Sequence, residues 1–132
     1  MGMTISISII TILLSGIFAV LVSNHFYKVN LEKQIKIDTF KKVFSNRYDL
    51  QGEEFSRALN EIFVIYSDSE QVLKTLNKFH DTITNNKIGA DDDLLKLLKA
   101  MCKEVDIDHE SVSDSFFLTP FNTKPSSMNK SK

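Results

Sequence analysis

Residues 4–22 read TISISIITILLSGIFAVLV, and this stretch contains no charged side chain. Twelve of its nineteen residues are Ile, Leu, Val or Phe. A helix of about 20 apolar residues crosses the roughly 30 Å hydrocarbon core of a bilayer. The stretch therefore predicts a transmembrane helix within an anchor of residues 1–27. A cleaved signal peptide is the competing interpretation, but it needs a basic segment before the apolar run and a small-residue cleavage site after it. Neither pattern is present, which favours the uncleaved anchor.

The charges of the remaining chain are unevenly distributed, although the formal net charge of all 132 residues is only −1. Residues 28–48 contain six basic and two acidic side chains, whereas residues 49–118 contain seven basic and fifteen acidic ones. Basic residues that flank a span stay on the cytoplasmic side. We therefore expect a single-pass protein of the bacterial cytoplasmic membrane, with its N-terminus outside and an acidic body in the cytoplasm. Membrane lipid would contact the span and the basic residues after it.

The apolar pattern after the span keeps a helical period, which predicts an all-α protein. The transmembrane helix is expected to continue as a basic stalk helix over residues 28–48. A small helical bundle with a short extended C-terminal arm follows over 49–121, and residues 122–132 form a disordered tail. Within the bundle, helices are predicted to start near Glu53, to be capped by Ser67, and to start again at 91–93, where three aspartates supply an N-cap and an acidic first turn. The apolar run 62–66 also fits a strand. The expected buried positions of the three bundle helices are Phe55, Ala58, Leu59, Ile62, Phe63; Val72, Leu73, Leu76, Phe79, Ile83; and Leu94, Leu95, Leu97, Leu98, Met101, Cys102, Val105.

No pattern of reactive side chains indicates an enzyme. The three histidines are far apart, the single cysteine lies in a leucine-rich stripe, and no glycine-rich phosphate loop is present. The sequence therefore predicts no catalytic residue, no cofactor and no metal. Since the body is acidic, we also expect no nucleic-acid partner.

One face of the predicted span carries small residues at intervals of four. These are Thr11, Ser15, Ala19 and Ser23. Small residues at this spacing allow two helices to approach closely in lipid, which would give a homo-oligomer through the span. The alternative is that the bilayer merely tolerates these side chains. Membrane crosslinking that Ser15→Ile and Ala19→Ile left unchanged would exclude the oligomer.

The only two arginines, Arg47 and Arg57, lie on either side of the predicted turn between stalk and bundle. Arginine forms planar, two-pronged hydrogen bonds that lysine does not reproduce. Two interpretations are open. The arginines fix the turn through internal salt bridges with nearby acids, or Arg47 and Asn60 face a partner or ligand.

The same residues carry a resemblance to a known family. The order of a span, a basic stalk, Phe40, Phe44 and Arg47, then Ala58-Leu59-Asn60, resembles the uncharacterised bacterial family catalogued as domain of unknown function 6680. Asn46 stands where that pattern usually has threonine before the arginine. Ala100-Met101 and residues 117–120 match more loosely. The resemblance implies a membrane-anchored helical fold and no catalytic residue.

Two functions fit these observations. The first is a non-catalytic, membrane-anchored interaction or regulatory module with an unknown protein partner. The second is a small oligomeric membrane effector, of a phage-related or defence type, that perturbs the bilayer. Dye entry or a loss of membrane potential on expression would favour the effector.

Overall fold

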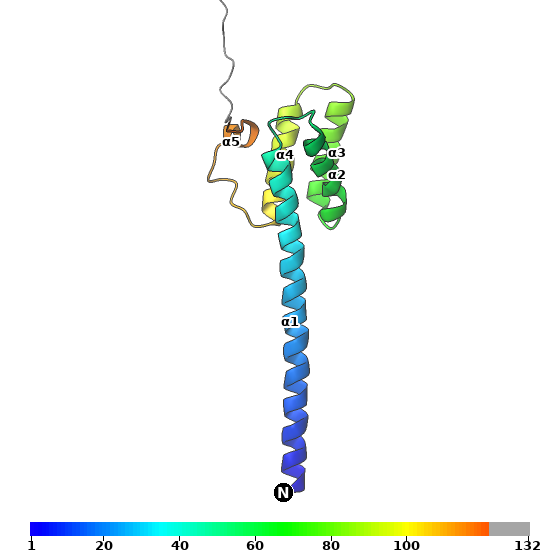
Figure 1. Ribbon diagram of the computed structural model, residues 1–132, viewed down its shortest axis with the longest axis vertical. Helices are drawn as coiled ribbons and strands as arrows, with labels where there is room; N and C mark the ends of the chain where they lie inside the picture. Colours follow the sequence, from blue (N-terminus) through cyan, green and yellow to red (C-terminus); the bar gives the residue numbers. More distant parts are fainter. Residues whose placement is uncertain (122–132) are drawn as a thin grey trace, which may run out of the picture. The chain divides into compact units, whose positions relative to one another are not determined.

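The computed structural model describes residues 1–121, and these residues are helical and contain no strand (Figure 1). The five helices of the described chain are α1 (Gly2–Ser45), α2 (Glu53–Ile65), α3 (Glu70–Thr84), α4 (Ala90–Glu104) and α5 (Asp114–Leu118). The predicted all-α class, with a long N-terminal apolar helix followed by shorter ones, is confirmed. The tail predicted to be disordered, 122–132, lies outside the described residues.

The chain divides into two compact units, Met1–Ile35 and a second unit that begins at Lys36. The first unit contains the apolar part of α1. Its most apolar 18-residue window has a mean hydropathy of 2.7, and no residue of this window is buried within the chain. The helix is therefore long and apolar enough to cross a membrane. The boundaries predicted at 27/28 and 48/49 rest on charge and stay predictions.

Hydroxyl groups in the first unit are bonded to the helix itself. Thr11 Oγ1 donates to the carbonyl oxygen of Ile7 at 2.9 Å, and Ser15 Oγ donates to that of Thr11 at 2.8 Å. Ser6 and Ser8 donate four residues back in the same way. Because an unpaired donor in hydrocarbon is costly, these bonds lower the cost of placing Ser and Thr in a span.

The core of the second unit is built around α4. Leu97, Leu98 and Met101 are fully buried, and α4 packs against α3 along its length and against α5 (Figure 1). All seven apolar residues predicted for this helix are buried. A helix that is apolar over more than half its circumference needs neighbours on several sides, which explains this central position.

The helix boundaries agree with the turn chemistry of the sequence, with three corrections. Residues 62–65 are helical, so the strand alternative is wrong. The N-cap of α3 is Ser69, whose Oγ accepts from the backbone N–H of Val72, and not Ser67. The acidic cap of α4 is also wrong, because its N-cap is Gly89 with a φ of 103°. The acidic first turn is confirmed, because Asp91, Asp92 and Asp93 all lie in the first turn of α4, where the helix dipole favours negative charge.

The C-terminal arm predicted to be extended contains the short helix α5. Ser113 caps it by accepting from the backbone N–H of Phe116 at 3.3 Å. Phe117 is buried against the core, and Lys99 of α4 pairs with Asp114 at 2.7 Å. The arm is therefore attached to α4 by packing and by one ion pair.

Candidate functional site

Two side chains that the helical period assigns to the core lie on the surface instead. Phe63 of α2 is 65% exposed and Ile83 of α3 is 48% exposed. Both had been predicted as buried, and both predictions are wrong. The reason is that no described segment covers the side of α2 and α3 on which they lie.

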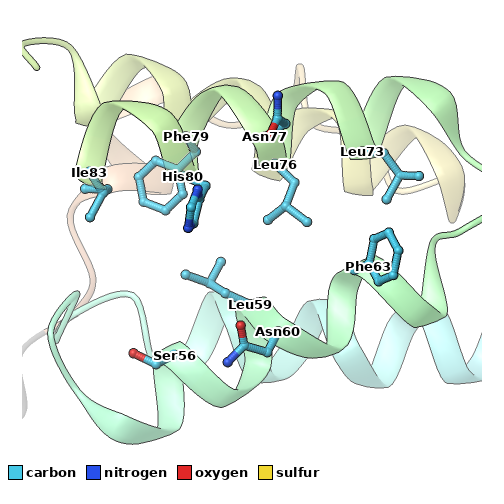
Figure 2. A pocket seen from close by; sticks show the side chains of 10 residues that line it. All are labelled: Ser56, Leu59, Asn60, Phe63, Leu73, Leu76, Asn77, Phe79, His80 and Ile83. Carbon is cyan, nitrogen blue, oxygen red and sulfur yellow. The ribbon is translucent and has the colours of Figure 1, made fainter. Parts of the chain in front are cut away.

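These two residues line a groove between α2 and α3 with a volume of about 600 Å³ (Figure 2). Phe63 and Leu73 lie at one end of the groove, and Ser56 and Ile83 lie at the other. The complete lining consists of Ser56, Leu59, Asn60, Phe63, Leu73, Leu76, Asn77, Phe79, His80 and Ile83. The walls are thus mainly aliphatic and aromatic.

Two amides add hydrogen-bonding capacity to this apolar groove. Asn60 projects from α2 and Asn77 from α3 (Figure 2). Neither side-chain amide makes a hydrogen bond within residues 1–121, so each keeps a carbonyl oxygen and an NH₂ group available. An apolar cleft with a few available polar groups is the usual composition of a binding site.

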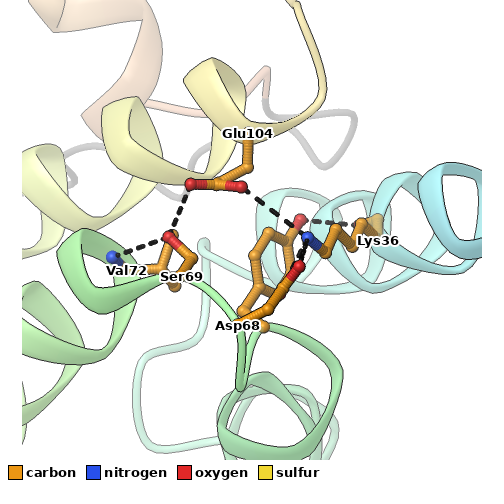
Figure 3. Close-up of polar contacts among 6 residues, drawn as sticks. Lys36, Asp68, Ser69, Val72 and Glu104 are labelled. Carbon is orange, nitrogen blue, oxygen red and sulfur yellow. Dashed lines mark hydrogen bonds and ion pairs between the residues drawn. The ribbon is translucent and has the colours of Figure 1, made fainter.

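A polar cluster holds the connection between α2 and α3. The cluster consists of Lys36, Tyr66, Asp68, Ser69 and Glu104, and we call it the turn cluster. Lys36 Nζ lies 2.9 Å from both carboxylate oxygens of Asp68 and 3.6 Å from Oε2 of Glu104 (Figure 3). Tyr66, which is fully buried, donates from its hydroxyl to the backbone carbonyl of Lys36 at 2.7 Å.

The same cluster joins the start of α3 to the end of α4. Ser69 Oγ donates to Oε1 of Glu104 at 2.6 Å while it caps α3 (Figure 3). The hydrogen bond from Lys36 is the main cause that lowers the pKa of Asp68, and burial raises the pKa of Tyr66. The turn at one end of the groove is therefore fixed to α1 on one side and to α4 on the other.

Arg47 lies two residues after the end of α1 and binds carbonyl groups. Only 7% of it is exposed. Its Nη1 donates to Phe44 at 2.5 Å, its Nε to Phe117 at 2.7 Å and its Nη2 to Phe116 at 3.0 Å. These carbonyls belong to the last turns of α1 and α5, which leave acceptors without a partner in their own helix. Arg47 thus caps two helices, and its guanidinium also stacks on the ring of Phe44, 3.6 Å from the centroid.

The other predicted residues occupy different places. Arg57 is exposed and pairs within α2 with Glu53 at 2.5 Å and Glu54 at 3.8 Å. Asn60 lines the groove, so the structure does not bring it together with Arg47 in one cavity. In the first unit, Thr11, Ser15, Ala19 and Ser23 are exposed, and the homo-oligomer through them stays a prediction.

The reactive side chains of the described chain are dispersed. Among residues 1–121, no three His, Cys, Asp or Glu side chains are grouped so that they could hold a metal ion. Burial of Cys102 raises the pKa of its thiol to about 11, so the nucleophilic thiolate is scarce at neutral pH. Asp93 is buried and accepts a hydrogen bond from Thr82 Oγ1.

The groove and the turn cluster were not predicted from the sequence, for different reasons. The groove had a signal, because the apolar run 62–66 is too wide for one buried helix face. No sequence pattern indicates the turn cluster, because Lys36 and Glu104 are far apart in the sequence and nothing near either residue distinguishes it from other charged residues.

The model of a family described as a family of unknown function, DUF6680, matches residues 1–116. The match includes the apolar helix, Arg47 and the whole groove. No curated protein and no solved structure matches the chain.

Proposed function

Because the chain belongs to DUF6680, a family of unknown function, we propose its role from its own chemistry. It is a single-pass, membrane-anchored and non-catalytic interaction module. Its α2–α3 groove binds an amphipathic helix of a protein partner and so recruits that partner to the membrane. The observation that carries this proposal is the apolar groove with Phe63 and Ile83 left uncovered.

The anchor is the first part of the proposal. The apolar helix spans the bacterial cytoplasmic membrane, and the six basic side chains of residues 28–48 lie on its cytoplasmic side. The N-terminus is then outside, and the second unit works in the cytoplasm. Each basic residue near anionic lipid contributes about 1 kcal/mol to membrane attachment, which strengthens this orientation.

The shape of the groove supports a helix as its occupant. Its walls are two helices of 13 and 15 residues, each about 20 Å long at 1.5 Å per residue. A helix laid along such walls presents apolar side chains at positions i, i+3, i+4 and i+7. A peptide that adds as a strand needs a free strand edge, and residues 1–121 contain no strand.

The lining favours the same occupant. Phe63, Leu73 and Ile83 supply apolar contacts from one end of the groove to the other (Figure 2). The available amides of Asn60 and Asn77 can bond to polar side chains at the edge of the bound helix. Covering the uncovered apolar area releases about 25 cal/mol for each Å² removed from water.

Site-specific photocrosslinking tests the proposal in cells that carry the protein naturally. A benzophenone amino acid is placed at position 63 of the full chain, and the adduct is mapped to a peptide by mass spectrometry. Position 64 is the matched control, because Val64 is 67% exposed, as much as Phe63, but does not line the groove.

We expect one dominant protein adduct from position 63, mapped to a segment with a helical apolar period, at least about tenfold above position 64. Equal yields from the two positions would contradict the proposal. An adduct to lipid alone, or to a segment without that period, would contradict it as well.

A further inference from the structure

The charges around the groove indicate what kind of helix it binds. We infer that the partner helix carries Lys or Arg on the polar side next to its apolar stripe. This inference rests on the proposed function and adds the chemistry of the partner.

The two lysines of α3 do not face the groove. Lys74 and Lys78 line a separate cavity of about 180 Å³, together with Asp93 and Lys96 of α4. On α2, Glu61 is paired with Lys42 of α1 at 3.0 Å. Neither lysine of α3 lines the groove, although Lys74 precedes the groove residue Asn77 by three.

The acids of α2 and α3 lie beside the groove. Residues three or four apart on a helix are neighbours on one face. Glu53 precedes the groove residue Ser56 by three, and Glu70 precedes the groove residue Leu73 by three. Both acids are exposed. The border of the groove is therefore acidic near both of these residues.

The basic residues near this border only partly compensate the acids. Arg57 is shared between two carboxylates, Glu53 and Glu54. Lys87 pairs with Asp81 at 2.7 Å, so that pair is neutral overall. Glu70 adds one further negative charge, and Lys74, which precedes the groove residue Asn77 by three, adds one positive charge. Glu53, Glu54 and Glu70 against Arg57 and Lys74 thus leave a surplus of one negative charge beside the groove.

A partner with a basic polar face fits this surplus, and one with an acidic polar face is repelled by it. Opposite charges at the rim of an interface raise the rate of association and select the partner. The neutral amides of Asn60 and Asn77 complement the charges, because their carbonyl oxygens accept from Lys or Arg. The apolar walls then provide affinity, and the acidic border provides specificity.

Charge reversal beside the groove tests the inference on the full chain with the photocrosslinker at position 63. The test variant carries Glu53→Lys and Glu70→Lys. The control variant carries Asp91→Lys and Glu110→Lys, which change the net charge equally. Asp91 lies in the first turn of its helix, as Glu53 and Glu70 do in theirs, so the control includes one of the two first-turn costs of the test variant.

We expect the groove variant to lower the yield of the protein adduct about tenfold or more, while the control variant leaves it unchanged. The mapped peptide is expected to contain Lys or Arg next to its apolar positions. If both variants give the original yield, or if the mapped helix is acidic, the inference is wrong while the proposed function stands. If position 63 gives no adduct above position 64 in the unmodified chain, the proposed function itself fails.

Discussion

Replacing Arg47 by methionine is expected to destabilise the second unit much more than the same replacement at Arg57. Methionine keeps an unbranched apolar stem in both places and removes the guanidinium. Arg47 is buried and holds three carbonyl oxygens, whereas Arg57 is exposed and pairs with two exposed carboxylates. The two variants therefore separate a buried capping role from a surface pair.

The expected magnitude follows from the bonds that are lost. Each of the three hydrogen bonds from the charged Arg47 contributes about 1.5 kcal/mol, at the low end for charged groups. The desolvation that lowers the pKa of Arg47 is removed with the charge and offsets part of this loss. The variant should lose about 3–4 kcal/mol of unfolding free energy. The exposed pairs of Arg57 contribute less than about 1 kcal/mol.

The assay uses Cys102, the only cysteine of the chain. Its thiol is 1% exposed within α4, so it reacts with a maleimide when the second unit unfolds. The full chain is held in detergent micelles, equilibrated in a urea series and labelled in a short pulse. The apolar helix does not contribute to this signal. With a slope of about 2 kcal/mol per molar urea, Arg47→Met shifts the midpoint down by roughly 2 M.

A small shift would refute this reasoning. If the midpoints of Arg47→Met and Arg57→Met agreed within about 0.5 M, the carbonyls of α1 and α5 would not depend on the guanidinium. Arg47→Lys should fall between the original chain and Arg47→Met, because one ammonium replaces a planar group that serves three acceptors.

Three further results are expected from urea unfolding of the full chain in micelles. The pH series for Asp68 and Cys102 are followed by circular dichroism, because maleimide labelling needs the Cys102 thiol and a pH near neutral. The Thr82 result uses the maleimide pulse. Asp68→Asn should cost less than about 1 kcal/mol, since Asp68 is 66% exposed. Lys36 lowers the pKa of Asp68 from 3.8. The stabilisation of the folded state by the Lys36–Asp68 pair is therefore present above about pH 4 and is lost as the pH falls through the lowered pKa. Burial raises the pKa of Cys102 from 9.0 to about 11 in the folded chain. The free energy of unfolding therefore does not depend on this thiol below pH 9, and it falls by about 2–3 kcal/mol as the pH rises from 9 through 11. Cys102→Ala should remove that alkaline loss, and an unchanged alkaline profile would contradict the raised pKa. Thr82→Val removes the donor to the buried carboxylate of Asp93 and should cost about 1–3 kcal/mol, whereas no shift in midpoint would show that the bond is not needed.

Most of the fold follows from local sequence patterns. An uncharged apolar stretch predicts the long N-terminal helix, and the leucine-rich positions of α4 predict its central burial. Helix starts were less predictable where several capping residues compete. Ser67 and Ser69 are both suitable caps, and the structure selects Ser69, which also bonds to Glu104. That bond joins residues far apart in the sequence, so no local pattern predicts it.

The candidate site shows the limit of periodicity more clearly. A helical period states which side chains share a face, but it does not state whether another segment covers that face. It assigned Phe63 and Ile83 to the core together with Phe55 and Phe79. Phe55 and Phe79 are buried, whereas Phe63 and Ile83 are exposed along the groove. The tertiary arrangement of three helices decides this difference.

The groove between α2 and α3 is proposed to recruit a protein partner to the membrane, so the location of that partner in cells tests the proposal most directly. Once crosslinking at position 63 has identified the partner, its share in the membrane fraction is measured in cells that carry Phe63→Ser or Val64→Ser. We expect Phe63→Ser to move most of the partner to the soluble fraction and Val64→Ser to leave it on the membrane, with the amount of the anchored chain unchanged in both. The same partner distribution in both variants would contradict the account.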